Sequence, residues 1–141
     1  MSLINPYKQS IERNLPRLLS LYDRDRTSVS CGIGDRDFWA WKTTDFSNAT
    51  FQSSAFSLLT ISRLGLSDQY PQREEMIKLA ISLIAALAKD KTKRHGLAEA
   101  FPNEKSFCVT GLVLNECISA FEELKPYLDE KTLLLFEEIC Y

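Results

Sequence analysis

Two short segments of similar sequence limit the folds that are open to this chain. Phe46-Ser47-Asn48 is followed 55 residues later (101 − 46 = 55) by Phe101-Pro102-Asn103. Each copy ends a segment rich in charged and aromatic residues and opens an apolar stretch. Repeats of this length are typical of proteins that stack helix–loop–helix units. The repeat therefore predicts a duplicated helical hairpin, with its two starting helices side by side and parallel and both loops at one end of the molecule.

The pattern of apolar residues predicts an all-α fold. Apolar residues recur with a helical period, and no stretch alternates as a β-strand does. Chain length and an ordinary apolar content of 45% indicate one domain over residues 1–141. The expected helices cover residues 5–22, 48–65, 71–88, 103–124 and 129–139.

Residues with capping or breaking chemistry mark the ends of these helices. Asn48, Asn103 and Asp129 are good N-caps, because a short polar side chain accepts a hydrogen bond from a free backbone N–H. Gly65 is suited to the position just after a helix, where the backbone is left-handed. Pro16 is expected to kink or restart the first helix.

Two of the helices have an expected core face. Residues 76–88 are apolar on almost every side, so this helix should be covered by its neighbours. Gly111 costs about 1 kcal/mol against alanine inside a helix, which suggests a close helix approach there. On the second helix the expected core residues are Phe51, Ala55, Phe56, Leu58, Leu59 and Leu64. On the fourth they are Phe107, Val109, Leu112, Val113, Cys117, Ile118 and Phe121, with Cys108 also buried.

Charge and cysteine content argue against several classes of protein. The net charge of −2 offers no general attraction for nucleic acid. There is no apolar run of membrane-spanning length and no signal pattern, so a reduced cytoplasmic location is expected. Four cysteines without a C-x-x-C pair and a single histidine make a zinc site improbable, and we expect neither a metal nor a cofactor.

The first long loop, residues 24–47, has the composition of a sugar-binding site. Trp39 and Trp41 could stack on the apolar face of a pyranose ring, since indole rings combine apolar area with a polar edge. The charged residues beside them could bind hydroxyls or a uronate carboxylate: Asp35, Arg36 and Lys42. Equally, the tryptophans could close the end of the core while the charges pair with one another.

The second loop, residues 89–103, offers candidates for acid–base chemistry. His95 could act as a general base oriented by Glu99 or Glu104, and Asp45 with Glu99 could form an acid–base pair across the two loops. Asn103 and Glu104 lie at an expected helix N-terminus, where free N–H groups favour an anionic ligand. A histidine in a loop is also a common surface residue, and Glu104 is explained by the helix dipole alone.

The stretches GIGDRDFWAWKTTDFSNATFQSSAFSLL (32–59) and HGLAEAFPNEKSFCVTGLVL (95–114) resemble (α/α)-toroid proteins of polysaccharide loci. This group includes heparinase II/III-like lyases and terpene-cyclase-like domains. The resemblance implies antiparallel helical hairpins around a cleft that binds substrate at one end. It would place Asp35, Arg36, Trp39, Trp41, Lys42, Asp45, Glu99, Pro102, Asn103, Glu104 and Ser106 in that cleft. A complete toroid has more hairpins than the two and a half or so that this chain could supply.

Two functions are compatible with the sequence. The chain could bind or process an anionic polysaccharide, with catalysis assigned to Asp45, His95 or Glu99. Alternatively it is a non-catalytic helical interaction module whose open face is covered by a second copy or by a further toroid domain. A terpene-cyclase-like activity is a third option, resting on Asp35-x-Asp37.

Overall fold

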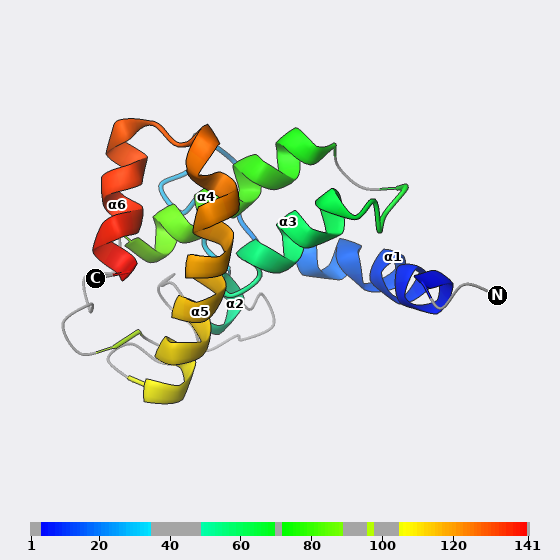
Figure 1. The fold of residues 1–141 in the computed structure, drawn as a ribbon, viewed down its shortest axis with the longest axis horizontal. Helices are drawn as coiled ribbons and strands as arrows, with labels where there is room; N and C mark the ends of the chain where they lie inside the picture. Colours follow the sequence, from blue (N-terminus) through cyan, green and yellow to red (C-terminus); the bar gives the residue numbers. More distant parts are fainter. Residues whose placement is uncertain (1–3, 35–48, 70–71, 89–95, 98–104, 141) are drawn as a thin grey trace.

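The computed structural model describes residues 4–34, 49–69, 72–88, 96–97 and 105–140 (Figure 1). This part of the chain confirms the all-α prediction, since its named elements are all helices and its β structure is limited to isolated bridges such as that between Tyr22 and Gly34. The helices are α1 (Ile4–Ser20), α2 (Ala49–Gln52), α3 (Ala55–Arg63), α4 (Arg73–Ala88), α5 (Phe107–Leu124), the 3-10 turn η1 (Lys125–Tyr127) and α6 (Glu130–Cys140).

The apolar helix α4 lies at the centre of the fold. It contacts α2, α3, α5 and α6, and α1 also packs on it. More than half of its residues are buried, which confirms that a helix apolar on nearly every side is covered by its neighbours. Glu74 and Glu75 occupy its first turn, where negative charge interacts favourably with the helix dipole.

Two apolar clusters fill the interior, one on each side of α4. The central cluster joins α2 to α6 and includes Ala55, Ile84, Val113 and Phe136. The second cluster attaches α1 through Leu15 and Leu19, which pack with residues of α3 and α4. As a result α1 and α6 lie at opposite ends of the long axis of the molecule (Figure 1).

The second predicted helix is divided into α2 and α3. The break falls at Ser53 and Ser54, where the Ser53 hydroxyl donates a 2.7 Å hydrogen bond to the carbonyl of Thr50. Short polar side chains compete with the helical backbone in this way. The predicted end is confirmed: Gly65 has φ +59°, and its N–H and that of Leu66 bond back to the carbonyls of Ser62 and Ile61. This is the Schellman arrangement of a helix C-terminus.

The start of α5 differs from the prediction. The cap is Ser106, whose Oγ accepts a 3.2 Å hydrogen bond from the N–H of Val109, so the prediction that Asn103 caps this helix is wrong. A serine hydroxyl caps a helix about as well as an asparagine amide, and the extended backbone of Ser106 gives it the required geometry. Asp129 does cap α6 as predicted, accepting a 2.7 Å bond from Thr132 N–H.

The core face of α5 also differs from the prediction. Val113, Cys117, Ala120 and Leu124 are buried, whereas Phe107, Leu112, Ile118 and Cys108 are exposed. The helical pattern admits either side of this helix, because apolar residues lie on both. On α3 the expected core residue Leu64 is likewise exposed, since it lies in the turn that ends the helix. Pro16, expected to kink or restart the first helix, lies within α1, which continues as one element to Ser20, so the helix does not restart there.

The two helices of the predicted repeat contact each other. Both α2 and α3 pack on α5. In Figure 1 α5 stands steeply across the molecule and α3 runs obliquely away from it, so their axes cross, unlike the side-by-side, parallel arrangement that the repeat predicted.

Candidate functional site

The residues predicted to bind or act on a ligand lie outside the described residues. They are Asp35, Arg36, Trp39, Trp41, Lys42, Asp45, His95, Glu99, Asn103 and Glu104. The structure does describe the points where the chain enters and leaves the first of these segments, at Gly34 and Ala49.

A buried glutamine fixes both of these points. Gln52, fully buried in α2, accepts a 2.7 Å hydrogen bond from Gly34 N–H through Oε1. Its Nε2 donates to the carbonyls of Gly32 and Leu83, each at 2.8 Å. Gln52 therefore ties the entry of the segment to α2 and to α4. We name this arrangement the Gln52 clamp.

Gly32 and Gly34 allow the chain to pack closely against α4 and α2 at the Gln52 clamp. Gly32 has φ +87°, and a Cβ atom added there would lie 2.1 Å from the carbonyl oxygen of Ser82 in α4. A Cβ atom on Gly34 would lie 2.5 Å from that of Phe51. Both positions need glycine because the chain presses directly onto the helices.

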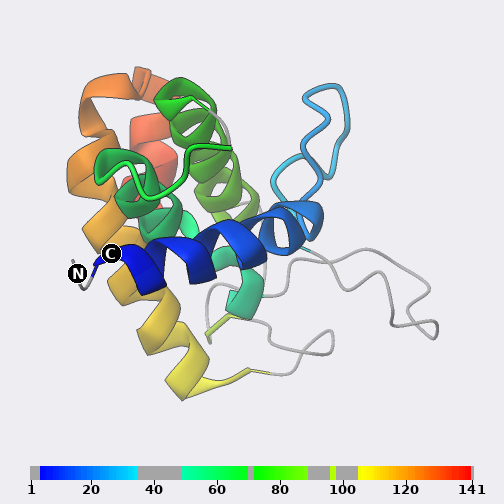
Figure 2. The same cartoon turned by 90° about the vertical axis from the view of Figure 1, so that its right-hand side faces the viewer.

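The described residues also form a small hollow between the loop after α1 and helix α4. In Figure 2 this loop, residues 21–34, stands out from the helices. The hollow has a volume of about 140 Å³. Its lining combines apolar, charged and thiol side chains: Leu19, Asp23, Arg24, Arg26, Cys31, Glu75, Lys78, Leu79 and Ser82.

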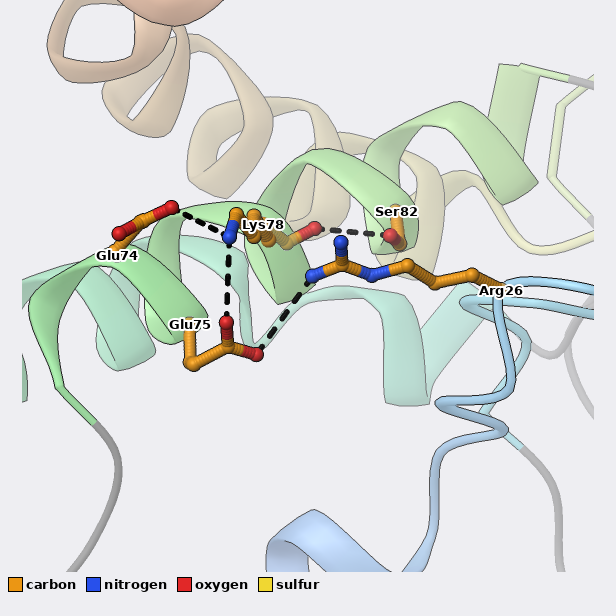
Figure 3. A network of polar contacts seen from close by, with 5 residues as sticks. All are labelled: Arg26, Glu74, Glu75, Lys78 and Ser82. Atoms are coloured by element: carbon orange, nitrogen blue, oxygen red, sulfur yellow. Dashed lines mark hydrogen bonds and ion pairs between the residues drawn. The ribbon is translucent and has the colours of Figure 1, made fainter.

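Many of the charged groups at this hollow pair with one another (Figure 3). The Arg26 guanidinium lies 3.7 Å from Glu75, and the Lys78 ammonium lies 3.3 Å from the other oxygen of the same carboxylate. Lys78 also pairs with Glu74, which raises the pKa of the lysine and lowers the pKa of Glu74. Of these contacts, Arg26–Glu75 joins the loop to α4, while the pairs of Lys78 lie within the helix; together they leave less charge to attract a ligand.

The loop itself is ordered by its own hydroxyl groups. Ser30 Oγ donates a 2.6 Å bond to Asp23, and this bond, followed by one from Ser28, lowers the pKa of Asp23. Thr27 acts in the same way on Asp25. Both carboxylates are thus committed to turn structure, and neither has the raised pKa expected of a general acid.

A different kind of surface lies on α5. Its outward positions from the N-terminus to Ile118 carry no charged side chain, and we name them the α5 face: Phe107, Cys108, Gly111, Leu112, Asn115 and Ile118. Phe107 is 93% exposed, Leu112 58% and Ile118 50%. A Cβ atom added to Gly111 would meet no atom within 4 Å. The helix approach predicted at this glycine is therefore not made by the described part of the chain.

Metal binding and membrane spanning find no support in the described part of the chain. No three His, Cys, Asp or Glu side chains there are grouped so as to hold a metal ion. None of the helices described is both long and apolar enough to cross a membrane.

Two roles were not predicted from the sequence: the bonds of buried Gln52, and the capping of α5 by Ser106, which the toroid resemblance placed in the cleft. The signal for Gln52 was a single amide among the apolar residues of the second predicted helix. That for Ser106 was a serine directly before the apolar run that starts at Phe107.

Comparison with known proteins adds no relative to this description. No protein-family model matches the chain, and no curated protein or solved structure is significantly similar to it.

Proposed function

We propose that this chain is a non-catalytic helical interaction module that docks an apolar helix of another protein chain onto the α5 face. The observation that carries the proposal is the exposure of Phe107, Leu112 and Ile118 on one side of a helix whose other side is buried. A helix that is apolar on both sides is normally covered on both.

Covering the three exposed side chains of the α5 face supplies a driving force for binding. Fully burying a large apolar side chain contributes about 1.5–3 kcal/mol, so covering these three supplies several kcal/mol before the cost of association. Gly111 adds a geometric reason, because the space above it lets the backbone of a second helix approach closely.

The charges of the hollow support the same proposal. Arg26 of the loop and Lys78 of α4 both pair with Glu75. Mutual pairing is the outcome expected of a scaffold, whereas a site for an ionic ligand keeps its charges available.

Binding of a synthetic amphipathic helix tests this function. A leucine-faced peptide of about 20 residues, long enough to be helical, is titrated into the ¹⁵N-labelled chain, alongside the same residues in scrambled order. We expect amide shifts centred on Phe107–Ile118 with the leucine-faced peptide alone. Shifts of equal size with both peptides, or shifts confined to other helices, would argue against the module.

Matched variants make the test specific. Phe107→Ser and Leu112→Ser should each weaken the peptide by several-fold, because each removes apolar area from the contact. Val29→Ser is the control, since Val29 is as exposed as Phe107 but lies in the loop after α1. Equal weakening by Val29→Ser would indicate non-specific adhesion.

Binding or processing of an anionic polysaccharide is the second proposal, and the Gln52 clamp favours it. Loops whose two ends are held close together are frequently functional, and the clamp joins Gly34 to α2 by a 2.7 Å bond. The segment between them carries Trp39, Trp41 and the acid–base candidate Asp45, with His95 and Glu99 on the other loop.

A thermal-shift screen with acidic oligosaccharides tests this second proposal. A ligand at a hundredfold excess over its dissociation constant stabilises the folded state by about 2.7 kcal/mol, which gives a measurable shift in Tm. The shift should be lost in Trp41→Ala. A screen in which no acidic glycan changes Tm would leave the interaction module as the single proposal.

A further inference from the structure

We infer that the helix received by the α5 face is α5 of a second copy of this chain, paired antiparallel. This inference rests on the proposed function, since it names the partner of the same surface.

The outward positions of the α5 face carry no charge. Between Phe107 and Ile118 the outward positions are apolar, small or neutral, so two identical faces meet without burying like charges. The α5 face, hereafter also the apolar strip, is roughly 16 Å long at 1.5 Å per residue. A single crossing of two helices can cover this length.

The positions of large and small residues are complementary in the antiparallel direction. When two copies of α5 pair about residue 113, Gly111 of one copy lies opposite Asn115 of the other. Cys108 then lies opposite Ile118, and Phe107 lies beside Ser119. Gly111 lets the two backbones approach, Leu112 lies beside this closest point, and the bulky Phe107 and Ile118 lie outside it, as packing of side chains between helices requires.

Charges at the two ends of the strip also favour this direction. The first charged residue before the strip is Lys105 and the first on the outward side after it is Glu122, both exposed. The antiparallel register brings Lys105 of each copy within about one residue of Glu122 of the other, and the twofold symmetry makes this contact twice. Parallel pairing would instead set Glu122 against Glu122 and align the helix dipoles unfavourably.

The size of the surface predicts a weak dimer. Three partly exposed side chains offer an area of about 300–400 Å² per copy, below the 800 Å² or so per partner of a standard stable interface. We therefore expect a dissociation constant on the order of 0.1 mM for the dimer, so that monomers dominate at micromolar concentration.

Sedimentation of the full chain across a concentration series tests the pairing. Leu112→Glu should abolish the concentration-dependent rise in mass, and Val29→Glu should leave it unchanged. Glu122→Lys alone and Lys105→Glu alone should each weaken the dimer about threefold to tenfold, and the double variant should restore it, because it exchanges the two charges. Failure of the double variant to recover would overturn the register.

Cross-linking tests the direction independently. Ile118→Cys in a Cys31→Ser, Cys140→Ser background should give a disulfide-linked dimer with native Cys108 under mild oxidation. Residues 108 and 118 of one helix lie about 15 Å apart, too far for an intramolecular bond. A dimer that forms equally well with Ile118 retained would show Cys108–Cys108 contact and parallel pairing, which contradicts the inference.

The outcomes separate this inference from the function on which it rests. If the chain stays monomeric at high concentration but the synthetic peptide still binds at Phe107–Ile118, the second copy is wrong as partner and the interaction module stands. If neither binds, the module itself is wrong.

Discussion

Replacement of Gln52 by leucine should destabilise the fold by about 2–6 kcal/mol. Leucine has a similar volume but cannot bond, so Gly34 N–H and the Gly32 carbonyl lose their 2.7 Å and 2.8 Å hydrogen bonds in a buried site. Each buried backbone group left without a partner costs about 1–3 kcal/mol. The third acceptor, Leu83 O, is inside α4 and can keep its helical bond, so we count two lost groups.

Urea unfolding followed by far-UV circular dichroism measures this loss. With a slope of about 2 kcal/mol per molar urea, the midpoint should fall by about 1–3 M with the slope unchanged. Gln9→Leu in the exposed face of α1 is the matched control and should move the midpoint little.

The related variant Gln52→Glu separates bonding from shape. A carboxylate can accept the bond from Gly34 N–H but repels the two carbonyl oxygens. Burial should raise its folded-state pKa, so the variant should be most stable in acid and lose stability as pH rises above about 4. Two results would refute the role of the Gln52 clamp in fixing this segment. One is a loss of less than about 1 kcal/mol in the free energy of unfolding of Gln52→Leu, and the other is a Gln52→Glu variant whose stability does not change with pH.

Four further changes test other parts of the fold. Gly111→Ala should raise the stability by about 0.5–1 kcal/mol, because it adds a good helix former where a Cβ atom has open space; a decrease would contradict that packing. Gly65→Ala should lower it by about 1–2 kcal/mol through its φ of +59°, and an unchanged Tm would mean that the turn relaxes. Gly32→Ala should be more damaging still, since its Cβ atom would clash with the Ser82 carbonyl; near-native urea unfolding would disprove that contact. Burial raises the pKa of Tyr22 to about 12, so the folded state holds the phenol proton above pH 10 while the unfolded state releases it. Stability should therefore fall by about 2–3 kcal/mol between pH 10 and 12, and Tyr22→Phe should remove that part of the slope; identical slopes would rule out this linkage.

Local signals in the sequence predicted the helices well. The all-round apolar pattern of residues 76–88 identified the central helix, because only a covered helix tolerates such a pattern. Gly65 and Asp129 identified helix ends through chemistry that acts over three or four residues. Such signals are contained within one turn and do not depend on the rest of the fold.

Two features depend on tertiary packing and could not be predicted from local sequence: the buried face of α5 and the bonds of Gln52. Phe107, Leu112 and Ile118 have the same apolar character as Val113 and Cys117, and only the position of the neighbouring helices determines which set is buried. The three bonding partners of Gln52 lie 18, 20 and 31 residues from it in the sequence, so no local sequence pattern predicts the Gln52 clamp. The ligand site predicted around Trp39 and Trp41 remains a prediction.

The base of the loop after α1 is closed by its own backbone. Asp23 N–H bonds to the Ile33 carbonyl at 3.1 Å, and Gly32 N–H returns a 2.8 Å bond to the carbonyl of Asp23. Val29, near the far end, is 95% exposed. Insertions are best tolerated at such tips. An epitope or a fluorescent label inserted at Val29 should therefore be accessible and should disturb the helices little.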